Sequence, residues 1–339
     1  MAGVVSSVAM PAFRRALVLA VALLGATGCS SSVRARAETL ADGGAATARA
    51  ASDAIGATGS AVETWVEAQL LLAPLTGRPE PGEEAIASLD RARRALGARA
   101  EAVRSLADAY TALGALAAYD AAGAAEQGVN ALAGAVNGYG EALGQPAPKA
   151  TTTWTAAKAG GVLAGARQAR RLKAGSAAIR ESVEHLAAHL RREQEALASV
   201  RRVLVEGQGA AVRAFVALGL GRPGALLAPH VSGFGLAWDE KQLDPVMTLL
   251  RKEPSITKEE GQTREDDLRR GLEKVLERRV RRRAEVEAAI VDEMIGGLEA
   301  LAVAHGKFES SGEVDLAGVT ERLAAMRAAV DEFRALEGR

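Results

Sequence analysis

Apolar residues in this chain recur at steps of three and four over long stretches, and this spacing constrains the fold more than any other feature. The pattern is clearest between residues 86 and 117. It places apolar side chains on one face of a helix. No segment alternates apolar and polar residues over the length of a strand, and no Asn-Gly or Asp-Gly pair joins two apolar runs as a hairpin turn. We therefore predict an all-α fold.

The stretch from 86 to 117 predicts an amphipathic helix with one buried face and one charged face. The residues expected on the buried face are Ile86, Leu89, Leu96, Ala100, Val103, Ala107, Tyr110 and Ala117. The residues expected to face water are Arg91, Arg94, Arg99, Glu101 and Arg104. Thr257 and Glu260 resemble a capping box that opens a long charged helix to about residue 304, and a last helix is expected from residue 314.

Small side chains dominate the composition, because aromatic residues make up 3% of the chain and alanine is frequent throughout. Such a chain must bury area by bringing helices close together, at about 25 cal/mol per Å² of apolar surface. In an Ala/Gly-rich hairpin between residues 112 and 166, Gly134/Gly138 and Gly161/Gly165 form two small-xxx-small pairs. They favour a tight antiparallel pair of helices.

The predicted architecture is an elongated antiparallel multi-helix bundle, because two helices run near forty residues at about 1.5 Å each. Proline and glycine clusters and composition divide the chain into five parts. These are a signal peptide at 1–28, a tether at 29–36, a helical bundle with the Ala/Gly hairpin at 37–217, a long irregular loop at 218–244, and C-terminal helices at 245–339 that pack on the same bundle.

The chain has one cysteine, Cys29, at the end of the sequence Leu-Leu-Gly-Ala-Thr-Gly-Cys. Arg14 and Arg15 precede an apolar run from Ala16 to Ala26. That run is well short of the roughly twenty residues that cross a bilayer as a helix. A short basic segment, a short apolar core and small residues at the cut site are typical of an export signal.

These residues resemble the signal of bacterial lipoproteins. The resemblance implies a diacylglyceryl group on the Cys29 thiol, cleavage that makes Cys29 the first residue, and acylation of its new amine. Ser30 after the cysteine, in place of Asp, implies the outer membrane of a Gram-negative bacterium. The alternative is an ordinary secretory signal with Cys29 as a free thiol. Translation could start at Met1 or Met10. The remainder loosely resembles Ala-rich helical lipoproteins of Gram-negative bacteria, which implies no mechanism.

One stripe of polar residues is a candidate metal site. Glu181, His185, His189 and Glu193 are each four residues apart, so they project from nearly one face of a helix. Imidazole pairs at this spacing bind zinc, and carboxylates would complete the ligand shell. The spacing lacks the His-Glu-x-x-His pattern of metalloproteases. We favour a polar stripe with weak side-chain pairing, and expect no cofactor beyond the lipid on Cys29.

Charge and motifs argue against catalysis and nucleic-acid binding. The chain has 42 basic and 42 acidic residues, so no net field steers it to anionic partners. The arginine-rich run at 278–283 is flanked by glutamates and is expected to be a solvated helix face. The glycines at 219–224 lack the lysine of a phosphate loop, and no Gly-x-Ser-x-Gly motif occurs.

We expect a lipid-anchored cell-envelope protein that works as a helical binding or scaffold module and is not an enzyme. Its partners would be the membrane, through the anchor, and another envelope protein. The long loop with Phe234 and Trp238 is the candidate contact surface, because long loops are often functional. One alternative is a membrane-active or pore-forming protein that uses the 112–166 hairpin. A second is a metal-binding helical protein centred on His185 and His189.

Overall fold

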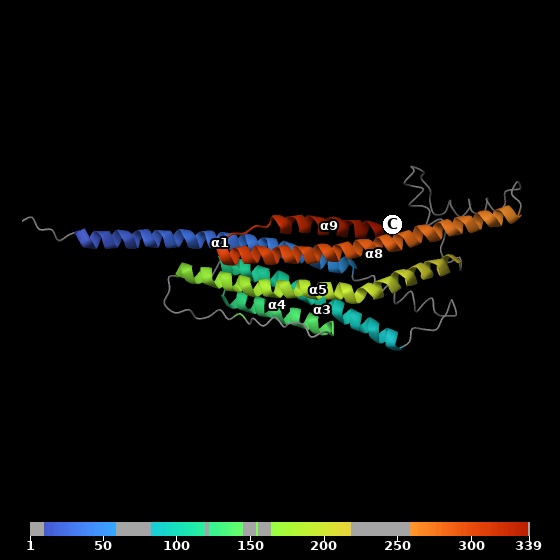
Figure 1. Cartoon of the computed structure of the whole chain (residues 1–339), viewed down its shortest axis with the longest axis horizontal. Helices are drawn as coiled ribbons and strands as arrows, with labels where there is room; N and C mark the ends of the chain where they lie inside the picture. Colours follow the sequence, from blue (N-terminus) through green and yellow to red (C-terminus); the bar gives the residue numbers. More distant parts are fainter. Residues whose placement is uncertain are drawn as a thin grey trace, which may run out of the picture. The chain divides into compact units, whose positions relative to one another are not determined.

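A computed structural model of the chain describes residues 10–58, 83–118, 122–144, 154, 164–217 and 258–337, with the side chains of most of them. These residues form six helices and, within the described ranges, no strand. The helices are α1 (Met10–Thr58), α3 (Glu83–Ala118), α4 (Ala122–Ala142), α5 (Ala164–Ala217), α8 (Lys258–Ser311) and α9 (Ala317–Glu337) (Figure 1). The prediction of an all-α multi-helix bundle is therefore confirmed. The predicted loop at 218–244 lies outside the described residues.

The helices divide into two compact units, each assembled from three distant segments. Unit 1 comprises Met1–Ser52, Gly97–Leu190 and Met294–Ala324, and unit 2 comprises Asp53–Leu96, Arg191–Glu293 and Ala325–Arg339. Each unit therefore takes segments from both sides of the predicted loop. The helices after residue 245 therefore contribute to both units, together with segments from 37–217.

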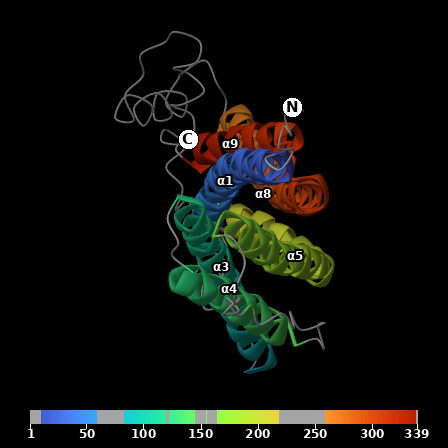
Figure 2. The same cartoon turned by 90° about the vertical axis from the view of Figure 1, so that its left-hand side faces the viewer.

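The core of unit 1 combines leucine side chains with alanine-lined contacts, as the composition predicts. Helix α1 buries a nearly continuous series of small residues, among them Ala37, Ala41, Ala45, Ala48 and Ala51. These let α1 lie close to α3, where a Cβ added at Gly114 would be 3.5 Å from the Ala41 Cβ. Helices α1, α3, α5 and the adjoining part of α8 lie side by side when viewed end-on (Figure 2).

The predicted glycine contact of the hairpin is not seen in the part that the structure describes. Gly134 and Gly138 are exposed on α4, and no described atom lies within 4 Å of a Cβ added at either position. Their expected partner Gly161 lies outside the described residues. Helix α4 instead packs on α3 through Gly128, where an added Cβ would be 3.0 Å from the Ala112 Cβ.

Helix α3 is amphipathic as predicted, but its buried face is turned relative to the expected one. Val103 and Tyr110 are buried, whereas Ala100 and Ala107 are only half-buried. Arg99 was expected to face water and is instead buried at 5% exposure. The additional core residues on this helix are Ala95, Ala102, Leu106, Ala109, Leu113 and Leu116. The wider apolar face explains the error, because steps of three and four fit more than one choice of central stripe.

The tether expected at 29–36 is part of α1 in the structure. Arg34 donates from Nε to the carbonyl oxygen of Ala117 at 3.0 Å and from Nη2 to that of Ala118 at 3.2 Å. These two carbonyls belong to the last turn of α3, which has no intrahelical donors for them. The guanidinium therefore ties the beginning of the bundle to the C-terminus of α3. None of the described helices has an apolar stretch sufficient to cross a membrane.

The junction between α8 and α9 explains why these helices end and begin where they do. Gly312 follows α8 with φ of 75°, a left-handed conformation that glycine adopts without steric cost. Its amide donates to the Phe308 carbonyl at 2.9 Å. Asp315 then caps α9 by accepting from the Ala317 amide at 3.1 Å. Hydrogen bonds from Lys307 and from that amide lower the pKa of Asp315, so this cap carries a negative charge.

Candidate functional site

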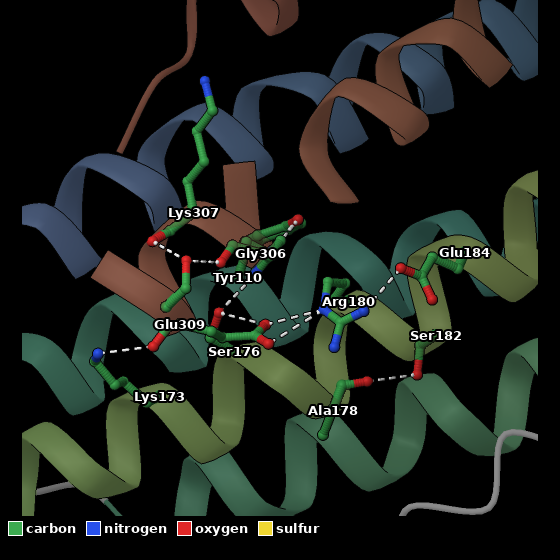
Figure 3. A network of polar contacts seen from close by, with 12 residues as sticks. Tyr110, Lys173, Ser176, Ala178, Arg180, Ser182, Glu184, Gly306, Lys307 and Glu309 are labelled. Atoms are coloured by element: carbon green, nitrogen blue, oxygen red, sulfur yellow. Dashed lines mark hydrogen bonds and ion pairs between the residues drawn. The ribbon is translucent and has the colours of Figure 1, made fainter. Parts of the chain in front are cut away.

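The most elaborate polar arrangement among the described residues lies inside unit 1, where His305 of α8 meets α3 and α5. Figure 3 shows Tyr110, Ser176, Arg180 and Glu309 of this arrangement. The Tyr110 hydroxyl of α3 is 2.8 Å from His305 Nε2, and the Ser176 hydroxyl of α5 is 2.7 Å from His305 Nδ1. All three residues are completely buried. Both ring nitrogens therefore have a partner, as a buried imidazole requires.

The network continues from Ser176 to an ion pair nearer the surface. Ser176 Oγ is 3.4 Å from Glu309 Oε1, and Arg180 Nε is 3.1 and 3.2 Å from the two carboxylate oxygens of Glu309. Arg180 also binds Glu184 at 2.9 Å, and its side chain is 34% exposed. Lys173 Nζ donates to the Glu309 backbone carbonyl at 2.7 Å. Helices α5 and α8 are thus joined by a charged group at the edge of a buried polar chain.

The contacts of this network favour one assignment of hydrogen-bond donors and acceptors. The Tyr110 hydroxyl donates to His305 Nε2, His305 Nδ1–H donates to Ser176 Oγ, and the Ser176 proton points to the Glu309 carboxylate. In the opposite tautomer the proton is on His305 Nε2, and the Ser176 hydroxyl would donate to His305 Nδ1. Ser176 Oγ and Glu309 Oε1 would then face each other with no proton between them. A neutral imidazole has one donor and one acceptor nitrogen, so the first arrangement uses every group once.

The protonation states follow from burial. Burial, with a smaller contribution from the positive charge of Arg180, lowers the pKa of His305 to about 3. Burial also raises the pKa of Tyr110. The Glu309 hydrogen bond raises the pKa of Arg180. At neutral pH the inner part of the network is therefore uncharged, and its charges are confined to the half-buried ion pair.

The distance between Ser176 and His305 would suit a nucleophile and its general base, but their burial does not. Both side chains have 0% exposure, so a substrate could not reach the hydroxyl without separation of the helices. The arrangement fits a structural role, in which three helices are held in one register by mutually satisfied groups. The sequence signal for it was weak, because His305 and Tyr110 occupy positions of apolar stripes.

The four residues of the candidate metal stripe do not form a cluster of metal ligands in the part of the chain that the structure describes. His185 Nε2 is 4.0 Å from Glu181 Oε1, and both side chains are partly exposed. His189 is buried at 1% exposure and meets the Tyr139 ring edge-on, with centroids 5.6 Å apart. Glu193 is buried further along α5. No group of three or more potential metal ligands occurs within the described residues.

The arginine-rich run at 278–283 includes contacts that stabilise unit 2. Arg282 binds Glu332 of α9 at 2.6 Å and Glu285 of its own helix at 3.3 Å. The Arg283 guanidinium lies 5.0 Å from the centre of the Phe333 ring, a cation–π contact. Arg278, Arg281 and Arg282 are exposed, as a solvated helix face requires. Arg282 and Arg283 also hold α9 against α8, a packing role that the sequence did not indicate.

The remaining predicted site residues are outside what the structure describes. Phe234 and Trp238 fall in the undescribed part of the chain, and Cys29 lies in α1 without a described side chain. A buried residue that the sequence did not single out, Trp154, is held by Asn130 of α4. The Trp154 amide donates to Asn130 Oδ1 at 3.1 Å, and Asn130 Nδ2 donates to the Trp154 carbonyl at 3.3 Å.

Comparison with known proteins adds no relative to this description. No protein-family model, no curated protein and no solved structure matches the chain. Its class is defined by the fold alone, an all-α multi-helix bundle.

Proposed function

We propose that the chain is a lipid-anchored protein of the cell envelope, on the outer membrane of a Gram-negative bacterium, and that it acts as a helical binding or scaffold module without catalysis. The observation that carries the proposal is the basic, apolar and small-residue pattern that ends at Cys29. Arg34, five residues further on, already belongs to the packed part of unit 1. The proposed acyl chains would therefore be attached next to folded structure.

The experiment that tests the anchor is mass spectrometry of the N-terminal peptide from protein produced in a Gram-negative host, together with palmitate labelling. We expect a peptide that starts at Cys29 and carries acyl chains. Cys29→Ser should abolish labelling, whereas the matched variant Ser31→Ala should retain it. An unmodified Cys29 thiol in the wild-type protein would refute the anchor.

The binding role is supported by the burial of the polar network. Among the described residues, the one serine–histidine pair at hydrogen-bond distance is enclosed by α3, α5 and α8. We propose that function resides instead in contacts with another envelope protein, with Phe234 and Trp238 as contact residues. A photo-crosslinking residue at Trp238 in cells should give one adduct of defined mass, and the same residue at exposed Arg104 should not. Identical adduct patterns at the two positions would contradict this assignment.

The membrane-active alternative requires α4 to leave the core of unit 1, which would expose its buried apolar side chains. Its apolar side chains Val129, Leu132, Val136 and Tyr139 are buried in unit 1 and would have to leave the core. Burial of each is worth about 1.5–3 kcal/mol. Dye release from anionic vesicles separates the two functions, since a scaffold protein leaves the vesicles sealed and a pore former empties them.

A further inference from the structure

The end of unit 1 that lies nearest Cys29 is fixed by two side chains that bind the same helix terminus. Arg34 binds the carbonyls of Ala117 and Ala118, and Gln168 of α5 donates to the Leu116 carbonyl at 2.9 Å. Arg34 follows Cys29 by five positions in the helix, a rise of about 7.5 Å. The first described turns of α5 and the last turn of α3 therefore lie within a short distance of Cys29.

Basic residues gather at this end of unit 1, which we call the anchor end. It includes Arg34 and Arg36 of α1 and Arg167, Arg170, Arg171 and Lys173 of α5. Arg36 reaches across to the Gly312 carbonyl at 2.9 Å and is exposed, as is Arg170. The contact of Lys173 with the Glu309 backbone brings α8 to the same end.

Acidic residues at the anchor end are fewer than the basic ones. Lys307 and Asp315 form an ion pair at 2.7 Å, and Glu309 is bound by Arg180. The other described acidic residues on the adjoining turns are Glu38, Glu126 and Glu313. The six basic residues of the anchor end outnumber these three carboxylates by two to one, in a chain whose net charge is zero.

We propose that the anchor end docks directly on the anionic phosphate headgroups of the membrane leaflet that holds the acyl chains. The proposal rests on the lipid anchor proposed above. Arginine binds phosphate through two parallel hydrogen bonds, and each basic residue near an anionic surface strengthens attachment about fivefold. Arg34 and Arg36 lie about 7.5 and 10.5 Å along the helix from Cys29, comparable to the Debye length of about 8 Å in physiological salt.

Docking of this kind would orient unit 1 on the membrane. Since residues 31–36 are helical and Arg34 is bound to α3, no free tether separates the anchor from the bundle. The exposed arginines would then meet headgroups at the same time as the acyl chains insert. The opposite end of unit 1, with Arg49 of α1, would be held about 30 Å from Cys29 along the helix.

The test uses the full lipidated chain with one introduced cysteine, because lipidation leaves no free thiol of its own. Arg170→Cys and the matched control Arg49→Cys replace exposed arginines and are labelled with a fluorophore. Each is reconstituted in vesicles that contain a headgroup-attached quencher, with phosphatidylcholine alone or with phosphatidylglycerol added. We expect strong quenching at position 170 and little at 49. Phosphatidylglycerol should increase quenching at 170, and Arg36→Glu or 0.5 M salt should reduce that gain several-fold (about fivefold per charge removed).

Two results would overturn the docking proposal while the anchor stands. Equal quenching at positions 170 and 49 would show that the anchor end does not face the membrane. Equal quenching at position 170 with and without phosphatidylglycerol would show that anionic headgroups do not contribute to docking. Mass spectrometry of the same preparations reports acylation of Cys29, so failure of the anchor is distinguished from failure of the docking surface.

Discussion

Gly44, which lets α1 approach α3 closely, provides a test of the packing in unit 1. Gly44 faces the Tyr110 ring so closely that an added Cβ would overlap three ring atoms. Tyr110 is fully buried and its hydroxyl binds His305, so a movement of the ring would disturb both the core packing and this hydrogen bond. Gly44→Ala should therefore displace either the ring or the whole of α1.

The magnitude follows from three opposing effects. Replacing a helical glycine by alanine gains about 1 kcal/mol in helix propensity. Overpacking a filled core costs about 1–3 kcal/mol, and loss of the Tyr110–His305 hydrogen bond with a buried partner left behind costs a further ~1–3 kcal/mol. We expect a net destabilisation of about 3 kcal/mol.

A matched control exists on the same helix. Gly56 is exposed, and no described atom lies within 4 Å of a Cβ added there. Gly56→Ala should therefore show the propensity gain alone, about 1 kcal/mol of stabilisation. Urea unfolding followed by circular dichroism at the helix band would compare the two variants with the wild type. If Gly44→Ala were as stable as Gly56→Ala, the contact between α1 and the Tyr110 ring would be wrong.

Three further predictions test other parts of the structure. The pKa of His305 is about 3 in the folded protein and near 6.5 in the unfolded chain. Between these pH values the unfolded chain binds a proton that the folded protein does not. The free energy of unfolding should therefore fall as the pH drops from 6.5 to 3, by up to about 1.4 kcal/mol per pH unit. His305→Gln should flatten this part of the pH profile, and an unchanged slope would contradict the burial. Asn130→Leu should red-shift the tryptophan emission by freeing Trp154, with an unshifted spectrum as the contrary result. Phe333→Ala should cost about 3–5 kcal/mol in urea unfolding whereas exposed Arg334→Ala should cost little, and equal effects would refute the packing of α9.

Helical periodicity was enough to predict the fold class and several long helices, because the pattern is repeated over many turns. On α8, Met294, Leu298 and Leu301 recur at steps of four and three, and all three are buried in the core. The same stripe continues to His305 and Phe308, and there the prediction stopped, since a histidine is a poor signal of burial. Its partners Tyr110 and Ser176 come from α3 and α5, and no local pattern records which helices will meet.

The division of the helices into two units could not be predicted from local sequence patterns either. Local periodicity does not indicate that the helices form two compact units, each of which combines segments from both sides of residues 218–244. A long helix can pass from one unit to the next without any break in its periodicity, as α5 does at Leu190 and α8 at Met294. Arg99 shows the same limit on a smaller scale, because its burial depends on which neighbouring helix covers α3.

The buried polar network fixes the register of helices whose contacts are formed largely by alanine. Faces such as that of α1 present many similar small side chains, so sliding one helix along another by a turn of about 5.4 Å would exchange alanine for alanine at little cost. The same slip on α8 would separate His305 from the hydroxyls of Tyr110 and Ser176. Each buried group left without its partner would cost about 1–3 kcal/mol. The network therefore adds specificity of register where the apolar contacts supply mainly area, and the proposed anchor end depends on that register to bring α1 and α5 to one surface.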